Sequence, residues 1–305
     1  MIAADGGGEA EDRRMRVLAV GLMCGAMLCF TGLDTCAKWL GFTLPAVQIV
    51  WARYVAAALL ALAASRPLSR PWALRSRKPW LQTLRSTLLL GSTTANFLAL
   101  RQLQLSETAT ISFLTPIFVA LFAGPLLGER VGAERMVAIA VGFLGVAIAT
   151  RPGTAAFQPI VLVAIAGVLC NTGYVLATRR LAATDAPQTT LAWTQLAGIV
   201  LLTPLLPWVW RDPTMAKVWL IMAVMGVFAA AGHLLLIVAH RFAPAPTLTP
   251  FSYTQLIWMI VSGIVVFGDW PSAETLIGAS LVVVCGAYLA LRERRGRRFS
   301  IDKVH

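Results

Sequence analysis

Charged residues are scarce in this sequence. Asp, Glu, Lys and Arg make up only 13% of the 305 residues, whereas 58% are hydrophobic. Soluble domains contain about a quarter charged residues and about half apolar ones. The composition therefore excludes an ordinary soluble protein and predicts an integral membrane protein.

Paired cysteines and catalytic motifs are also missing. The five cysteines lie inside apolar runs without CxxC spacing, which indicates neither a disulfide framework nor a metal site. The sequence has no GxSxG turn, HExxH helix, Walker-type loop or DDxxD-like acidic pair. We therefore expect no enzyme, no cofactor and no metal. Active transport would need an ion or solute gradient.

Apolar runs follow one another along the chain. A bilayer core about 30 Å thick needs roughly 20 residues of apolar helix to cross it. Runs near that length lie at residues 17–39, 45–64, 80–100, 107–127, 133–150, 158–180, 188–210, 215–238, 247–268 and 274–291. The connections between them are short, so we expect an all-α integral membrane protein with ten transmembrane helices. The first run is longer than a typical signal-peptide core and is interpreted as a retained helix.

Positive charge is distributed unevenly between alternate loops. The 26 basic and 14 acidic residues give a net charge of +12. One set of loops collects Arg13, Arg14, Arg16, Arg66, Arg70, Arg75, Arg77, Lys78, Arg130, Arg135, Arg179, Arg180, Arg241 and the tail from Arg292 to Lys303. The other set holds Lys38, Arg101, Arg151, Arg211 and Lys217. Because basic loops stay cytoplasmic, we expect both termini in the cytoplasm, a bacterial inner-membrane location and no nucleic-acid partner.

An internal repeat relates the two halves of the chain. Gly128-Glu129 and Gly268-Asp269 lie 140 residues apart, and the same shift aligns Ser112 with Ser252. Each half holds five helices, an odd number, so the second copy must enter the membrane from the opposite side. Inverted repeats are typical of secondary transporters, which bind substrate near the bilayer midplane between the halves. The predicted organisation is a cytoplasmic segment 1–16, repeats at 17–150 and 157–291, and a basic cytoplasmic tail at 292–305.

Two stretches carry a family resemblance. "LRSTLLLGSTTANFLALRQLQLSETATISFLTPIFVALFAGPLLGERVGAERMVAIAVGFLGVAIATRPG" resembles the first repeat of the EamA-type drug/metabolite transporter superfamily. "TPFSYTQLIWMIVSGIVVFGDWPSAETLIGASLVVVCGAYLAL" is similar to its second repeat. The resemblance covers residues 17 to about 292 and identifies the superfamily more strongly than the substrate. One departure is that Pro116 has Leu256 as its counterpart, which puts in doubt whether a hinge at Pro116 is mirrored.

The resemblance also implies a mechanism. It implies alternating access around a central cavity built by the first, third, fourth, sixth, eighth and ninth helices, with the fifth and tenth helices at the periphery. Members of this ten-helix family export amino acids and other metabolites, or import vitamins and nucleoside-like compounds. The resemblance therefore leaves transport direction open.

Polar side chains inside the spans are candidates for substrate binding, because unpaired polar groups are costly in lipid. Helical spacing puts Thr108, Ser112 and Thr115 on one face of the fourth helix, and Ser252, Gln255 and Ser262 on one face of the ninth. The repeat shift carries Ser112 onto Ser252 and Thr115 onto Gln255. The alternative is that each hydroxyl bonds to a carbonyl of its own helix.

Aromatic and other polar residues in the same region complete the predicted cavity. An apolar pocket with a few polar groups suits an amphiphilic small molecule. The candidates are Phe113, Tyr174, Tyr253 and Trp258, together with Asn96 and His233. His233 could titrate and couple transport to protons, or it could be a satisfied hydrogen-bonding partner.

The stretch "FTGLDTCAKW" places charges inside the first span. Asp34 and Lys38 lie one helical turn apart, and antiparallel packing of the first two helices brings Arg53 to the depth of Asp34. The repeat shift maps Thr31, Asp34 and Lys38 onto Asn171, Tyr174 and Thr178. Asp34, Lys38 and Arg53 are either a structural ion-pair group or a gate at the outer end of the pathway.

These observations predict a gradient-driven transporter that exports amino acids or similar small amphiphilic metabolites by alternating access. Import of a vitamin or nucleoside-like compound is the nearest alternative, and a non-transporting membrane enzyme or scaffold is the alternative from another class. The expected partners are a small-molecule substrate, the lipid bilayer and a coupling proton, with the chain a monomer or homodimer. The candidate substrate-binding residues are Asp34, Asn96, Ser112, Phe113, Thr115, Asn171, Tyr174, His233, Ser252, Tyr253, Gln255 and Trp258. The candidate gating or ion-pair residues are Asp34, Lys38, Arg53 and Pro116.

Overall fold

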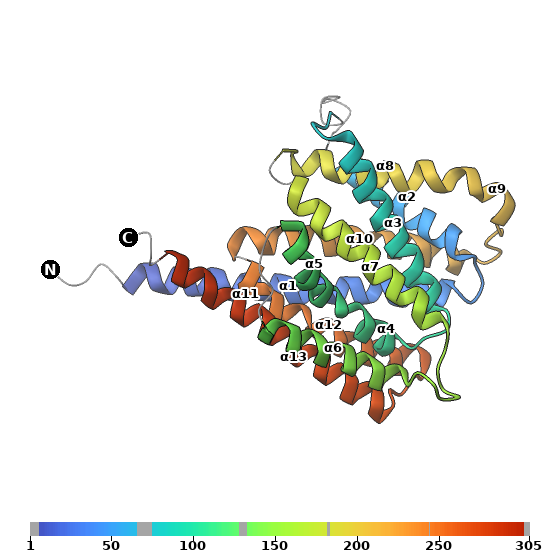
Figure 1. Cartoon of the computed structure of the whole chain (residues 1–305). Helices are drawn as coiled ribbons and strands as arrows, with labels where there is room; N and C mark the ends of the chain where they lie inside the picture. Colours follow the sequence, from blue (N-terminus) through green and yellow to red (C-terminus); the bar gives the residue numbers. More distant parts are fainter. Residues whose placement is uncertain (1–5, 66–74, 128–132, 182–183, 244, 302–305) are drawn as a thin grey trace.

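The fold is an elongated bundle of helices (Figure 1). The computed structural model describes residues 6–65, 75–127, 133–181, 184–243 and 245–301. Every regular element within these ranges is helical, as the sequence predicts. Six helical stretches are long and apolar enough to cross a membrane, and three shorter apolar helices cover 46–60, 136–150 and 273–289. The chain is therefore an all-α integral membrane protein.

The helices follow the predicted apolar runs, but three of the runs are broken. The unbroken helices are α1 (Gly6–Leu40), α2 (Ala46–Ser65), α3 (Pro79–Leu100), α6 (Ala133–Thr150), α7 (Ile160–Leu181), α10 (Ala216–Phe242) and α13 (Ala273–Ile301). The fourth run forms α4 (Leu105–Ser112) and α5 (Leu114–Leu127). The seventh forms α8 (Pro187–Leu202), the 3₁₀ turn η3 (Thr203–Leu205) and α9 (Leu206–Val209). The ninth forms α11 (Ala245–Ser252), α12 (Thr254–Ser262) and the π-helical turn η4 (Gly263–Phe267).

Packing between helices follows the internal repeat. The main partners of α1 and α7 are α10 and α3, respectively. The repeat shift equates α1 with α7 and α3 with α10, so these two pairs are copies of one contact. The pairs α2 with α10 and α8 with α3 are copies in the same way, and α6 packs on its own counterpart α13. The two halves are therefore related by an approximate two-fold axis.

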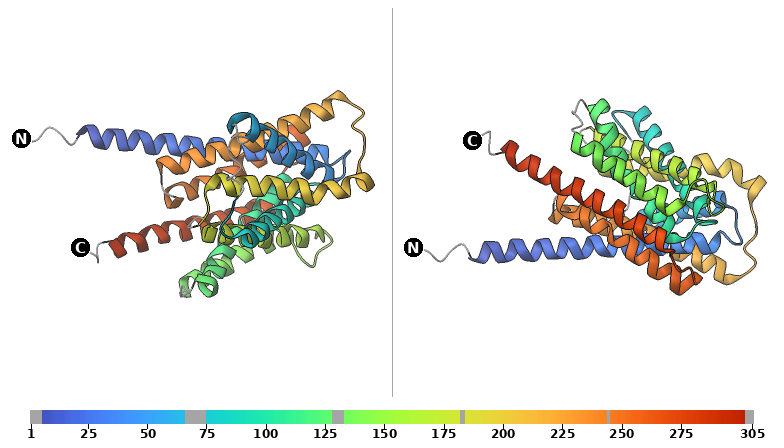
Figure 2. Two further views of the ribbon diagram at one scale, coloured as in Figure 1. Left: turned by 90° about the horizontal axis from the view of Figure 1, so that it is seen from above. Right: turned by 60° about the horizontal axis from the view of Figure 1, so that its bottom comes forward.

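The two ends of the chain lie at one end of the bundle. The views agree that α1 starts, and α13 finishes, on the same side (Figures 1 and 2). An even number of membrane crossings gives this arrangement. We call this the terminal end of the bundle, and the other the distal end.

The peripheral pair α6 and α13 packs backbone to backbone. An added Cβ at Gly278 would collide with the carbonyl oxygen of Gly145 and lie 2.8 Å from the Cβ of Ala149. Only residues without bulk allow helices to approach this closely in a membrane. The contact holds the fifth and tenth spans together.

The breaks in the fourth and ninth spans are equivalent. Continuous helix is interrupted at Phe113 and at Tyr253, which the repeat shift superimposes. Their rings touch in an edge-on arrangement, with centroids 4.9 Å apart and planes inclined by 66°. Two equivalent residues can touch each other only where the two-fold axis passes, so the axis runs between these rings.

The two breaks arise from different residues. Pro116 has no N–H to donate to the carbonyl of Ser112, and its ring crowds that carbonyl. In the ninth span, the hydroxyls of Ser252 and Thr254 donate to the carbonyls of Thr249 and Phe251, each at 2.7 Å. Such side-chain bonds compete with the helical backbone ladder. The break is thus mirrored even though the proline is not.

Candidate functional site

A cavity of about 200 Å³ lies at the junction of the two halves. Its walls come from α1, α2, α3, α4, α5, α7 and α12. The lining residues are Phe30, Leu33, Asp34, Arg53, Ser92, Thr93, Asn96, Phe97, Ser112, Thr115, Ala164, Gly167, Val168, Asn171 and Gln255. The first, third, fourth, sixth and ninth spans were expected here. The second span contributes Arg53, whereas none of these residues comes from the eighth.

Asp34 is the buried carboxylate of this cavity. Its side chain is 7% exposed, and its oxygen Oδ1 accepts a hydrogen bond from Asn96 Nδ2 at 3.1 Å. Arg53 lines the same cavity but donates to Thr93 Oγ1 at 3.0 Å, and its Nε has no partner among the described residues. Within the described part of the chain, no ion pair shorter than 4 Å joins Asp34 to Lys38 or Arg53. The cavity therefore holds one acidic and one basic group that are not bonded to each other.

Three carboxamide side chains converge on the cavity from different helices. Asn96 comes from α3, Asn171 from α7 and Gln255 from α12. Asn171 Nδ2 donates to Thr115 Oγ1 at 3.3 Å, across the interface between α7 and α5. Each carboxamide offers hydrogen-bond donors on its nitrogen and an acceptor on its oxygen, so the three side chains can bond to the donors and acceptors at the edge of a polar ring. The phenylalanines at 30 and 97 supply apolar faces beside it.

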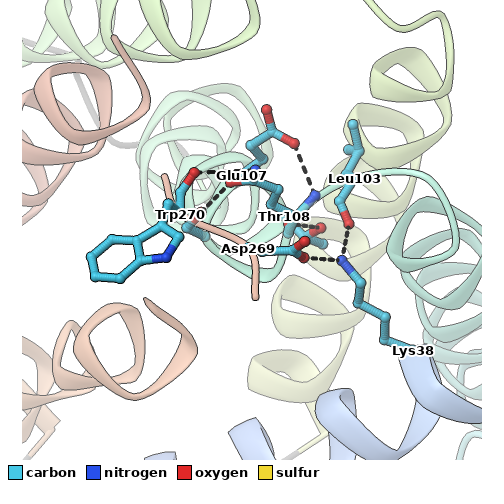
Figure 3. Close-up of polar contacts among 8 residues, drawn as sticks. Lys38, Leu103, Glu107, Thr108, Asp269 and Trp270 are labelled. Atoms are coloured by element: carbon cyan, nitrogen blue, oxygen red, sulfur yellow. Dashed lines mark hydrogen bonds and ion pairs between the residues drawn. The ribbon is translucent and has the colours of Figure 1, made fainter. Parts of the chain in front are cut away.

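Lys38 lies at the distal end of the bundle and is bonded to two loop residues. Its ammonium donates to Asp269 Oδ2 at 2.7 Å and to the carbonyl oxygen of Leu103 at 2.9 Å. Figure 3 shows the ammonium pointing between these two acceptors. Gly268, in the left-handed conformation with φ of 70°, ends the ninth span and presents Asp269. We call Lys38, Leu103 and Asp269 the distal latch.

The distal latch differs from the expected pairing. Lys38 does not pair with Asp34, one turn earlier on α1, but with a residue of the opposite repeat. The sequence analysis did not single out Asp269 as a partner of Lys38, because helical spacing reports neighbours on one helix and not contacts between distant loops. The latch joins the first span to the connection between the third and fourth spans and to that between the ninth and tenth.

Arg85 forms a second buried network, which the sequence analysis missed. Its side chain is 3% exposed. Its Nε donates to Thr178 Oγ1 at 2.7 Å. One terminal nitrogen donates to Thr194 Oγ1 at 2.6 Å and to the Thr190 carbonyl oxygen at 3.3 Å. The other terminal nitrogen donates to Tyr174 Oη at 3.0 Å. We call these five residues the Arg85 cluster. A single charge inside the third apolar run was the signal that could have found it.

The remaining predicted residues lie outside the cavity lining. Tyr174 belongs to the Arg85 cluster, and Phe113 and Tyr253 pack on each other at the two-fold axis. His233 packs edge-on against Phe30, with ring centroids 5.1 Å apart. Ser252 bonds within α11, Trp258 packs against the apolar cluster that α1 forms with α10, and Pro116 lies just past the break. Any contact of these residues with substrate stays a prediction.

Half of the twelve predicted substrate-binding residues line the cavity, namely Asp34, Asn96, Ser112, Thr115, Asn171 and Gln255. The lining residues that the sequence analysis missed are Phe30, Leu33, Ser92, Thr93, Phe97, Ala164, Gly167 and Val168. Ser92 and Thr93 precede Asn96 on one polar stretch, which was a usable signal. The apolar lining residues and Gly167 cannot be distinguished by residue type from other residues of an apolar run, so no signal in the sequence marked them.

A family model identifies the chain. The model for the EamA-like transporter family matches residues 17–151 and again 158–292. The chain belongs to the EamA-like transporter family. Its two matched segments are the two halves that the approximate two-fold axis relates. The family is one of transporters, and this EamA-like chain is accordingly a membrane transporter with a small-molecule substrate.

Several relatives of this EamA-like chain are named as riboflavin transporters or S-adenosylmethionine uptake transporters. It is 26% identical to a riboflavin transporter of Brucella anthropi over 88% of this chain and 96% of the relative. It is 25% identical to a riboflavin transporter of Vibrio cholerae, over 90% and 94% of the two chains. An S-adenosylmethionine uptake transporter of Rickettsia bellii is 21% identical, over 91% and 95%.

A solved structure has the same fold. It superimposes with a TM-score of 0.62 over 91% of this chain and 98% of the other, at 19% sequence identity. At this identity the likeness extends to the fold alone. The whole EamA-like chain, rather than one repeat, is therefore the comparable unit.

Proposed function

We propose that this protein takes up a heteroaromatic metabolite, of the flavin or adenosyl type, by alternating access. The observation that carries the proposal is the set of three carboxamides that meet in one cavity beside two phenylalanines. Flavin and adenine rings have apolar faces and edges that carry both hydrogen-bond donors and acceptors. Such a ring fits between apolar side chains while its edge bonds to Asn96, Asn171 or Gln255. The names of the relatives, riboflavin and S-adenosylmethionine transporters, support the same substrate class.

The cavity in this structure is small for a ligand of the flavin or adenosyl type. Its volume of about 200 Å³ is smaller than the roughly 300–1,000 Å³ typical of pockets for ligands of this size. The distal latch joins α1 to two connections at the distal end, and the Arg85 cluster ties α3 to α7 and α8 towards the terminal end. We propose that opening one end at a time enlarges the cavity, with the mirrored breaks at Phe113 and Tyr253 serving as hinges.

The orientation follows from charge. The basic loops lie at the terminal end, so we propose that both termini are cytoplasmic and that the distal latch faces the outside. We also propose the division into a first repeat at 17–150 and a second at 157–291 as the two bodies that move.

Amino-acid export is the second candidate. The cavity contains Asp34 and Arg53 without an ion pair between them, and these groups could hold the ammonium and the carboxylate of an amino acid. A small zwitterion also suits the cavity volume of about 200 Å³. The adjoining carboxamides and phenylalanines would then have no specific role, which is why we place this candidate second.

Flux into proteoliposomes tests the proposal. Labelled riboflavin, S-adenosylmethionine and a panel of amino acids would be offered with and without a pH gradient. We expect saturable movement of a flavin or adenosyl compound that the unlabelled compound competes away. Movement of amino acids alone would favour the second candidate. If neither class of compound moves, both candidate functions are contradicted. If a pH gradient leaves the transport rates unchanged, transport is not coupled to protons.

A further inference from the structure

We propose that Arg85 binds an anionic group of the transported molecule on the path between the cavity and the terminal end. This inference rests on the proposed transport function, because the anion is carried by the substrate. Three charged side chains are buried in the described part of the chain: Asp34, Lys38 and Arg85. Lys38 forms an ion pair with Asp269. Asp34 lines the same cavity as the guanidinium of Arg53, although the two are not bonded to each other. Arg85 alone has no carboxylate within 4 Å among the described residues.

The partners of Arg85 are all neutral and exchangeable. Three of the four accepting atoms are hydroxyl oxygens, and the fourth is a backbone carbonyl. Hydrogen bonds between a guanidinium and a carboxylate or phosphate are shorter and roughly twice as strong as neutral ones. The planar guanidinium can present two parallel N–H groups to such an anion. An entering anion would therefore displace the hydroxyls.

Two more buried hydroxyls, those of Tyr54 and Ser86, have no acceptor among the described residues. The two side chains are 2% and 1% exposed. Ser86 follows Arg85 on α3, and the ring of Tyr54 packs against Gly198, one turn beyond Thr194 on α8. Buried donors without acceptors are costly unless a ligand completes them.

Helical spacing connects the Arg85 cluster to the cavity. On α7, Asn171 lines the cavity, and Tyr174 and Thr178 follow it on the same face at i+3 and i+7. On α3, Ser92 lines the cavity and Arg85 precedes it by seven residues, again on the same face. Seven residues of helix rise about 10 Å. A molecule with a ring in the cavity and an anionic group on a flexible arm of that length would reach both.

The repeat counterparts of the Arg85 cluster differ from it, so the proposed anion site lies only towards the terminal end. The repeat counterpart of Arg85 is Met225, and the counterpart of Thr178 is Lys38. The distal end therefore offers an ammonium already paired with Asp269, whereas the guanidinium of Arg85 has no carboxylate within 4 Å among the described residues. A substrate anion thus meets different chemistry at the two ends of its path.

Matched ligands and matched variants test this proposal. Binding of riboflavin and riboflavin 5′-phosphate, and of S-adenosylmethionine and its decarboxylated form, would be measured on the purified full chain. The variants are Arg85→Gln, Arg85→Lys, and the control Arg179→Gln, which removes an exposed charge from the last turn of α7. We expect the wild type and the control to prefer the more anionic member of a pair by about tenfold or more. Arg85→Gln should abolish that preference.

The outcomes separate the possibilities. An equal effect of Arg85→Gln on both members of a pair, or no preference in the wild type, would overturn the anion site. If Arg85→Gln does not fold, Arg85→Lys decides, because it keeps the charge but loses the planar fork and should retain only part of the preference. If no compound of either pair binds the wild type, the proposed function fails. Stabilisation by inorganic phosphate then tests the anion site: a rise in Tm that Arg85→Lys reduces supports it, and equal rises in all variants overturn it.

Discussion

At the scale of single residues, the account depends most on Asp34. Its carboxylate lies in the cavity with one neutral donor, Asn96 Nδ2, and no ion pair among the described residues. Replacement by Asn keeps the shape and removes the charge. Since hydrogen bonds to charged groups contribute about 1.5–3 kcal/mol, we expect Asp34→Asn to lower kcat/KM by about tenfold or more.

Stability should respond differently from transport. A buried carboxylate without an ion pair does not stabilise the fold, so Asp34→Asn should keep or raise the Tm. Asp212→Asn, in an exposed connection, is the control for loss of one acidic charge. Normal folding together with unchanged transport kinetics would rule out a role for Asp34 in the pathway.

Asp185 gives a prediction on pH. It lies between α7 and α8 and accepts hydrogen bonds from Ser76 Oγ, from the Arg77 N–H at 3.0 Å and from Gln82 Nε2 at 2.8 Å. Partial burial raises the pKa of Asp185, but these hydrogen bonds outweigh it and hold the pKa below its usual range. Stability from this carboxylate is therefore fully present above the ordinary Asp pKa of about 3.9 and is lost as pH falls through the lowered value.

The variant Asp185→Asn should therefore unfold at a lower Tm than the wild type at pH 7. The difference should shrink as the pH falls below about 4, where the wild-type carboxyl takes up its proton. Thermal scans at several pH values measure this. A difference that grows towards acid pH would show that the carboxylate does not stabilise this connection.

Residue identities were predictable where a polar side chain interrupts an apolar run. Asp34, Asn96 and Asn171 stood out for this reason and line the cavity. His233 stood out equally but packs against Phe30, because polarity alone does not say which way a helix face points. Arg85 was open to the same reasoning, because it is the one charged residue in the apolar run 80–100, as Asp34 is one of two in the run 17–39.

At the scale of elements, the broken fourth span is the feature to test. Replacing Pro116 with Ala restores an N–H that can donate to the Ser112 carbonyl and join α4 to α5. Since proline inside a helix costs about 3 kcal/mol, the variant should be at least as stable as the wild type. Transport should slow roughly severalfold, because a continuous helix removes one hinge.

Pro79→Ala is the control for this change, because Pro79 begins α3, where proline is tolerated. Flux and Tm would be measured for both variants. Faster transport by Pro116→Ala, or equal slowing by the two variants, would contradict a hinge at this break.

Elements were predictable to the extent that hydropathy defines them. The ten apolar runs give the spans, and the repeat shift gives their pairing. Pro116 was a candidate hinge in the fourth span, but the interruption at Tyr253 was not predicted, because hydropathy reports burial in lipid and says nothing of backbone continuity. In the ninth span the hydroxyls of Ser252 and Thr254 bond to carbonyls beside the break, but the same kind of bond occurs within the unbroken helix α1 and so did not indicate it.

At the scale of the whole molecule, the distal latch should hold the outside closed. Lys38→Met and Asp269→Asn each leave a charge without its partner, so each should shift the population towards an outward-open form. With the five native cysteines replaced, Ser112→Cys reports opening through its rate of reaction with an impermeant thiol reagent. We expect both latch variants to raise that rate.

Lys217→Met is the matched control, since Lys217 lies over the ring of Trp39 near the same end without joining the latch. Restoring a pair of opposite sign, with Lys38→Asp and Asp269→Lys together, should lower the rate again. Unchanged labelling in all of these variants would mean that the latch does not govern access to the cavity.

The central claim is that the cavity between the two repeats carries the transported molecule. Riboflavin and S-adenosylmethionine uptake by proteoliposomes containing the wild type, Asn171→Ala or Gln104→Ala tests it most directly. Asn171 lines the cavity, whereas Gln104 lies in the connection before α4. We predict saturable uptake of at least one compound by the wild type and the Gln104 variant, with KM raised about tenfold by Asn171→Ala. Equal KM values for all three proteins would contradict the claim.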